Sequence, residues 1–323
     1  MAVGSQLSQP PVVLINSANA FTQKYFEPIL ADSIFVPSPT WWRMTRLGHK
    51  VTGGALVWPV VTAEELTGGA YFGAQNLDTQ ASDSAQPAQL EWKFYYQTIA
   101  IPYTDWLLNQ GPQQVISLIK AKEEIAMASL LQKLSRAQYG TAPQNSSIDL
   151  DSIPAALGSL AGTYAGITLA QATNWASNGG AGPTSGSAVS LANMMTDYMS
   201  ATQGNEEPDT IVTTHNGWAA FWNLLQPLQR YTRDDETTRA GFKNHLMFNN
   251  AVVLRDRFVP AGEMEMFTSK YVYPAFHRDD YFTVDPFVKP TNQRVIVSQI
   301  FITLNLKFIS LRQQARRTGI TNA

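Results

Sequence analysis

The sequence has no cysteine among its 323 residues. Disulfide frameworks, thiolate metal sites and cysteine nucleophiles are therefore excluded, and the fold must be held by packing and hydrogen bonds. Charge is also scarce: only 15% of residues are charged, against about a quarter in ordinary soluble domains. Aromatic residues reach 11%. Because the centres of protein interfaces are rich in aromatics and poor in charge, the composition favours a chain that buries surface against other chains.

Long hydrophobic runs are missing as well. None reaches the roughly 20 residues that a membrane helix needs, so we expect no contact with a membrane. The first eleven residues carry neither a basic start nor an apolar core, and they do not read as a signal peptide. We therefore expect the product to stay in the cytoplasm of the cell that makes it. The net charge of −2 shows no basic excess that would indicate tight nucleic-acid binding.

Proline density in residues 1–40 disfavours long helices and predicts an extended arm, with room for one short helix over 19–30. Residues 51–62 and 89–103 predict strands, and the second alternates two kinds of side chain with a period of two. The segment between them is rich in Gly, Ala, Gln, Ser and Asp. Together these features predict a long two-stranded loop. Such a ribbon is marginal alone in water, so we expect it to lie on a neighbouring copy.

Residues 112–138 predict the longest helix, with Pro112 at its first position and Gly140 after its end. Residues 161–175 read as an irregular turn segment and 176–187 as a flexible loop. Asn216 is the expected cap of one of the later helices. The remaining expected elements are helices over 148–160, 188–203 and 216–229, and strands over 210–214, 251–255, 263–268, 284–288 and 293–309. The class is α+β.

This order of elements resembles the coat proteins of tailed bacteriophages, the Hong Kong 97-type fold. The similar local segments are TYAGITLAQATNW (163–175), DTIVTTHNGWAAFWNLLQ (209–226), the stretch 246–273 and LNLKFISLRQQARRTGI (304–320). The resemblance covers about residues 20–320. It implies an N-terminal arm (1–47), an extended loop (48–104), a peripheral domain (105–187) with the spine helix 112–138, an axial domain (188–285) and a return to the peripheral domain (286–323).

The resemblance also implies a function. Copies of the chain would assemble into hexamers and pentamers that form an icosahedral head around packaged double-stranded DNA, which they would touch without sequence preference. The expected location is the virion capsid, assembled in the cytoplasm of a host bacterium. We expect a separate scaffolding protein, a portal and, in some heads, a decoration protein as partners. Some relatives weld the shell by an isopeptide bond from a loop lysine, but no Lys or Arg occurs between Lys50 and Lys93, so we predict no such bond.

The predicted loop is acidic, and it supplies the first set of candidate contact residues. These acids would meet basic residues of a neighbour, among them Lys120, Lys122, Lys133 and Arg136, and would set register more than strength. The other interpretation is that they only keep the surface soluble. The expected intersubunit contacts are Glu64, Glu65, Asp78, Asp83 and Trp92.

Two further clusters are candidates. A mixed-sign group is expected to pair around the capsomer axis, unless it is a solvated loop. A small basic patch near the end is expected to contact a partner subunit or packaged DNA. The first group comprises Arg230, Arg233, Asp234, Asp235, Glu236 and Arg239; the second comprises Arg312, Arg316 and Arg317.

Signals of catalysis are weak. The four histidines are scattered without metal-ligand spacing, and the Ser-x-x-Lys match at Ser117 lacks the elements that accompany it in penicillin-binding enzymes. The glycine run 179–186 lacks the lysine of a phosphate loop. We predict no enzyme activity and no cofactor or metal. Two alternatives stay open: an encapsulin-type nanocompartment shell, and, from another class, a soluble hydrolase.

Overall fold

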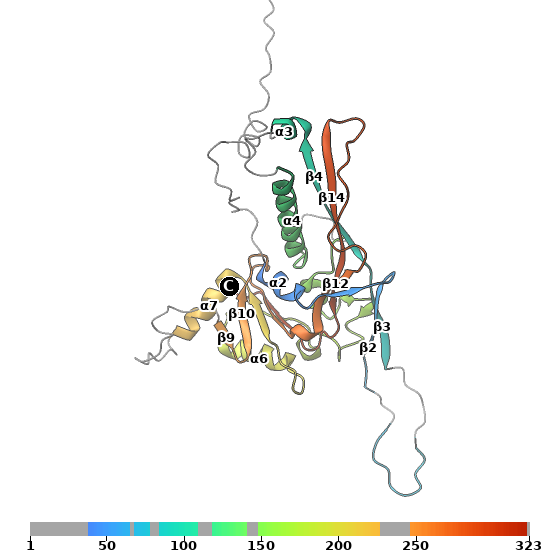
Figure 1. Cartoon of the computed structure of the whole chain (residues 1–323). Helices are drawn as coiled ribbons and strands as arrows, with labels where there is room; N and C mark the ends of the chain where they lie inside the picture. Colours follow the sequence, from blue (N-terminus) through green and yellow to red (C-terminus); the bar gives the residue numbers. More distant parts are fainter. Residues whose placement is uncertain are drawn as a thin grey trace, which may run out of the picture. The chain divides into compact units, whose positions relative to one another are not determined.

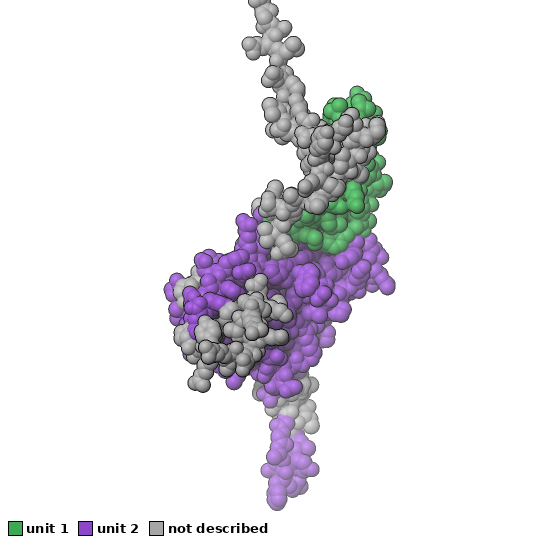
Figure 2. Space-filling view, turned by 60° about the vertical axis from the view of Figure 1, so that its left-hand side comes forward, with its two compact units in different colours: residues 1–36, 95–132, 282–302 green, residues 37–94, 133–281, 303–323 purple. Residues whose placement is uncertain are grey.

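A computed structural model describes residues 38–64, 68–77, 84–108, 118–140, 148–226 and 246–321 (Figure 1). The chain divides into two compact units, coloured separately in Figure 2. Unit 1 contains residues 1–36, 95–132 and 282–302, and unit 2 contains 37–94, 133–281 and 303–323. The predicted arm, including its helix over 19–30, lies outside the described residues except for 38–47.

The larger sheet of unit 2 has six strands in the order β7-β15-β11-β8-β10-β9. Its central strand β8 pairs in parallel with β10 and antiparallel with β11, so the sheet is mixed. The α+β class is confirmed. The strands are β7 (Thr184–Ser185), β8 (Thr210–Thr213), β9 (Leu246–Phe248), β10 (Ala251–Arg255), β11 (Met264–Phe267) and β15 (Ala315–Thr318).

Helices α6 (Leu191–Ala201) and α7 (His215–Leu225) pack on one face of this sheet. Tyr198 of α6 and Phe221 of α7 both meet Phe248 edge-on, with ring centroids 5.9 and 6.2 Å apart. The predicted cap Asn216 is wrong: the hydroxyl of Thr214 caps α7 by accepting a hydrogen bond from the amide of Gly217 at 3.0 Å. This packing forms one hydrophobic core cluster of unit 2.

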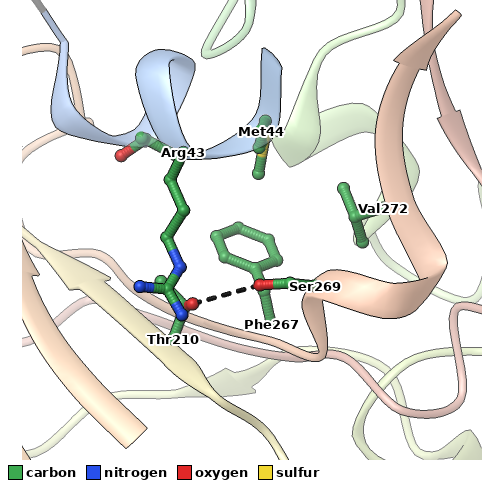
Figure 3. Close-up of a pocket in the computed structure, with 7 residues that line it drawn as sticks. Arg43, Met44, Thr210, Phe267, Ser269 and Val272 are labelled. Atoms are coloured by element: carbon green, nitrogen blue, oxygen red, sulfur yellow. Dashed lines mark hydrogen bonds between the residues drawn. The ribbon is translucent and has the colours of Figure 1, made fainter. Parts of the chain in front are cut away.

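Helix α2 (Pro39–Thr45) packs against β10 and β12, and its cap Ser38 joins a buried polar network. The Ser38 hydroxyl donates to Asp256 and accepts from the side-chain amide of Gln138 at 2.9 Å. Figure 3 shows the small pocket beside this helix, where Arg43 and Met44 of α2 face Phe267 and Ser269. These two hydrogen bonds hold Ser38 inside unit 2.

A second sheet is built around the long strand β14 (Val295–Phe308), close to the predicted 293–309. Strand β12 (Val272–His277) pairs antiparallel with β14 and parallel with β1 (His49–Val51). Strands β4 (Lys93–Pro102) and β13 (Thr283–Val284) also pair with β14. The strand predicted over 284–288 is shorter, because only an isolated bridge between Val288 and Val297 continues it.

The described part of the predicted spine helix is α4 (Leu118–Ala137), preceded by the short helix α3 (Tyr103–Leu108). The helix predicted over 148–160 is only α5 (Ile153–Ala156), which begins at a Ser152 cap and stops before Gly158. Within the described residues, 3-10 turns include η1 (Asn178–Gly180) and η3 (Ser269–Tyr271). Across the described residues, no helix is long and apolar enough to cross a membrane.

The loop predicted to be flexible over 176–187 is packed instead. Ser177 and Asn178 are buried, and the Asn178 side-chain oxygen accepts from the amide of Arg316 at 2.8 Å. A side chain on Gly180 would meet the carbonyl oxygen of Thr173 at 2.4 Å, so this turn requires glycine. Gly179 and Gly180 therefore serve close packing, since a side chain at either position would meet a backbone oxygen.

Candidate assembly surface

Strands β2 (Leu56–Val61) and β3 (Ala85–Leu90) form a two-stranded antiparallel hairpin with six paired positions (Figure 1). Side chains alternate along β2, so Leu56, Trp58 and Val60 are buried within unit 2 while their neighbours are exposed. The ammonium of Lys307 lies 4.5 Å from the Trp58 ring. The base of the hairpin therefore packs on its own chain, which the predicted ribbon did not anticipate.

The hairpin is held at its base by Asn305, a fully buried residue of β14. The Asn305 amide nitrogen donates to the carbonyl oxygen of Glu91 at 2.8 Å and to the carboxylate of Asp151 at 2.7 Å. Its amide oxygen accepts from the backbone nitrogens of Asp151 and Leu306 at 3.1 and 2.8 Å. All four hydrogen bonds are made with groups of the same chain. The base of the hairpin is therefore held in a fixed position within unit 2.

A second anchor comes from the turn between β5 (Thr163–Tyr164) and β6 (Ile167–Thr168). Its Ala165 carbonyl accepts from the amide of Gln89 at 2.9 Å. The Tyr164 hydroxyl donates to the carbonyl of Leu306 at 3.2 Å and accepts from the amide of Phe308 at 3.1 Å. Burial raises the pKa of Tyr164 far above its ordinary value, so this hydroxyl keeps its proton.

Beyond the anchored base, the end of the hairpin carries bare apolar side chains. Every residue of 68–77 is exposed in the isolated chain, and Figures 1 and 2 show this segment projecting from the rest of unit 2. Phe72 is 88% exposed, Tyr71 67% and Leu77 62%. Exposed apolar groups gathered in this way mark an interaction surface.

The outward face of the hairpin continues this surface. Val57 and Val61 of β2 are exposed, and Pro59 faces Pro87 across the ladder. Two facing prolines leave ladder positions without a donor, which suits an edge and not the middle of a larger sheet. We define the assembly hairpin as residues 56–90, with the tip 68–77.

The predicted contact residues of the loop have different positions. Glu64 is exposed, whereas Glu65, Asp78 and Asp83 lie outside the described residues. Trp92 was expected to contact a neighbour, but its own chain buries it to 9% exposure. Its indole nitrogen donates to the carbonyl of Gly53 at 2.8 Å, and its ring packs edge-on against His277. Trp92 therefore supports the base of the hairpin.

The predicted basic patch is not a free surface. Arg316 pairs with Glu263 at 2.7 Å, and both side chains are nearly buried. Arg317 pairs with Asp197 at 2.6 Å, with 9% and 2% of the two side chains exposed. Both charges are paired within unit 2, and the expected contact of these two arginines with DNA or a partner subunit stays a prediction. Arg312 is half-buried and lines an open pocket of about 320 Å³.

The predicted axis cluster (Arg230, Arg233, Asp234, Asp235, Glu236 and Arg239) lies outside the described residues, so its pairing stays a prediction. In the part of the chain that is described, no group of three His, Asp or Glu side chains is placed to hold a metal ion. Asp151 accepts a hydrogen bond from Asn305, and Asp280 accepts one from Thr303.

The apolar tip was not identified from the sequence. Its signal is the adjacent pair Tyr71 and Phe72 inside a segment of small and polar residues. The segment between the two strands has too few apolar residues to form a core of its own. Two adjacent aromatic residues there indicate a contact with another molecule. The prediction instead relied on the acids on either side of them.

No family model matches the chain, and no curated protein matches it either. Solved structures do. A protein of the cyanophage A-1(L) capsid asymmetric unit is similar at a TM-score of 0.74 and 15% identity, covering 93% of this chain and 97% of that one. The holo-SrpI encapsulin complex of Synechococcus elongatus PCC 7942 is similar at 0.56 and 10% identity, with 97% and 96% covered.

A structure from phage G is also similar. A chain from the major capsid and decoration proteins of phage G is similar at a TM-score of 0.53 and 10% identity, and 99% of this chain and 100% of that chain are covered. The match spans both units from end to end. The chain therefore has the fold of the tailed-phage major capsid proteins, and the Hong Kong 97-type fold predicted from the order of elements is confirmed.

Proposed function

We propose that this chain is the major shell subunit of a tailed-phage head. Copies assemble into hexamers and pentamers, and these close into an icosahedral shell around double-stranded DNA. The fold supports this assignment, because the similar solved structures are capsid assemblies and an encapsulin.

One observation carries the proposal: a firmly anchored hairpin presents Tyr71 and Phe72 to solvent. Because the base is anchored, the hairpin loses less conformational entropy when its tip binds a partner. Aromatic side chains bury a large area on binding and lose little rotamer entropy. Every assembly of this chain contains a second copy, so a second copy is the partner that we expect to cover the tip. The tip is therefore proposed to lie on a sister subunit.

The partners follow from this assignment. A scaffolding protein, a portal and packaged DNA belong to the proposed head, and a decoration protein is supported by its presence with the phage G capsid. The second candidate, an encapsulin-type compartment, is favoured only by the SrpI likeness. A cargo enzyme encoded beside the gene would favour it, whereas terminase and portal genes would favour a phage head.

Negative-stain microscopy of the expressed protein, alone and with its gene neighbours, tests the proposal. Shells, capsomers or tubes of regular subunits are expected. A protein that stays monomeric at high concentration and binds a small molecule in a pocket would contradict the proposal and support the hydrolase alternative.

A further inference from the structure

Two positive charges in unit 1 share one aromatic ring. The Lys289 ammonium lies 5.0 Å from the ring centre of Tyr103, and the Arg294 guanidinium carbon lies 4.4 Å from it. The backbone fixes this arrangement, because the amide of Tyr103 donates to the carbonyl of Arg294 at 3.1 Å. The quadrupole of the ring attracts each cation, although the two cations repel each other.

These side chains line an open pocket of about 490 Å³ in the loop that precedes β14. Both cations are exposed. Within the residues that the structure describes, the ion pairs are formed by other side chains, and none brings a carboxylate within 4.0 Å of Lys289 or Arg294. The pocket therefore has two like charges and no internal counter-charge, which suits an anionic guest.

The assembly hairpin carries the complementary charge. The sequence between Lys50 and Lys93 has no lysine or arginine, and its acids include Glu64, Glu65, Asp78 and Asp83. Glu64 is exposed. The acids that flank the tip have no lysine or arginine within this segment to neutralise them. Their counter-charge must come from solvent ions, from another part of the chain, such as Arg312 in the pocket that Glu64 also lines, or from another copy.

We propose that the pocket formed by Tyr103, Lys289 and Arg294 receives the acidic residues of the assembly hairpin of a second copy. This inference rests on the proposed function and names the docking site for the hairpin. The carboxylates neutralise both cations, and Tyr103 keeps the two cations in place. Such contacts fix which copy and which register the hairpin selects, while the apolar tip supplies most of the affinity.

The basic residues of helix α4 suit this role less well. Lys120 and Lys122 are two positions apart on a helix and therefore do not face the same side. Lys133 and Arg136 already have partners within the chain, and the Arg136 guanidinium lies 5.8 Å from the Phe258 ring. In the pocket, by contrast, the Lys289 and Arg294 charges lie over the same ring, that of Tyr103.

Packaged DNA is the other polyanion in the proposed head. A DNA duplex is bound through many phosphate contacts, and two cations can supply only a few of them. The hairpin is present in every copy and matches the pocket one to one. We therefore favour the hairpin and treat phosphate binding as an outcome that would overturn this inference.

A charge-swap experiment in assembling protein tests the pairing. The double variant Lys289→Glu/Arg294→Glu should lose shells and capsomers, as measured by sedimentation and microscopy. Adding Glu64→Lys, Glu65→Lys, Asp78→Lys and Asp83→Lys should restore them. The matched control Lys120→Glu/Lys122→Glu should assemble like the parent. Normal assembly of the first double variant, or a folded six-fold variant that stays unassembled, would overturn the pairing.

A binding measurement that needs no shells separates this inference from the proposed function. A fluorescent peptide of residues 61–85 should bind the full-length protein, and Lys289→Gln/Arg294→Gln should weaken that binding about tenfold, the effect of two exposed ion pairs. Binding of a short DNA duplex that needs both cations, without peptide binding, would overturn the inference in favour of phosphate. Peptide binding by a chain that never assembles would keep the pairing and refute the shell function.

Discussion

The side-chain amide of Asn305 donates to the carbonyl oxygen of Glu91 at 2.8 Å, so the last long strand holds the base of the assembly hairpin. The two residues are 214 positions apart in the sequence. Asn305 is fully buried, and each of its polar atoms is satisfied. Removing this side chain would leave several buried groups without partners.

Asn305→Leu should therefore lower the free energy of unfolding by about 2–4 kcal/mol, because buried partners are left unsatisfied. Urea unfolding followed by tryptophan fluorescence measures this loss. Asn216→Leu is the matched control, since Asn216 is exposed on α7 and does not cap it. Equal stability of the two variants would contradict the anchoring role of Asn305.

The tip should behave in the opposite way. Tyr71→Ser/Phe72→Ser should leave the free energy of unfolding within about 0.5 kcal/mol of the parent, because both side chains are already exposed. Assembly, followed by sedimentation velocity, should be lost. Ile148→Ser removes a side chain of similar exposure (61%) elsewhere in unit 2 and serves as control. Intact shells from the tip variant would show that the aromatics are not contacts.

The buried pair of Asp197 and Arg317 gives a prediction on stability. Arg317→Met should cost about 3–5 kcal/mol, because it leaves the Asp197 carboxylate buried without its counter-charge. The double variant Asp197→Leu/Arg317→Met should be more stable than Arg317→Met alone. Chemical denaturation of both variants and of Asp197→Leu completes a double-mutant cycle. Strictly additive losses would mean that the two groups do not interact.

Glu265 gives a prediction on pH. It is fully buried on β11, and neither carboxylate oxygen has a hydrogen-bond partner in the described part of the chain. Burial raises its pKa well above the ordinary value, and nearby Glu263 and Asp256 add to the effect while Arg316 opposes it. The folded protein therefore keeps a proton that the unfolded chain releases.

The stability contributed by this proton should fall as pH rises from the ordinary range of a glutamate toward the raised pKa, by up to about 1.4 kcal/mol per pH unit. Glu265→Gln should remove that slope. Melting temperatures of parent and variant between about pH 5 and pH 8 provide the measurement, since these values span the expected range. Curves that stay parallel would show that Glu265 is already ionised in the folded protein.

Local patterns predicted much of the fold. Strand 251–255 agrees with β10, and the helix over 188–203 agrees with α6 to within three residues at each end. The strand predicted over 89–103 is divided in two, because β3 ends at Leu90 and β4 begins at Lys93. The buried side chains change from Leu90 and Trp92 to Tyr95 and Ile99, so the inward face switches parity. The Glu91 carbonyl at this break accepts a hydrogen bond from Asn305, a contact that no local pattern contains.

The candidate site was harder to predict for the same reason. Arg316 and Arg317 read as a basic patch, because the acids that neutralise them, Glu263 and Asp197, are 53 and 120 residues away. The exposed tip could have been found from Tyr71 and Phe72, since no nearby strand or helix could bury them. The proposed cation pocket could not, because Tyr103 and Lys289 come together only in the folded chain.

Site-specific photocrosslinking at position 72 tests the central claim most directly. A photoreactive phenylalanine replacing Phe72 should give covalent dimers when assembled particles are illuminated, and the dimers should disappear when the particles are first dissociated. Mass spectrometry should place the link on a second copy. Links confined to the same chain, or illuminated protein that stays a solitary monomer at every concentration, would contradict the account.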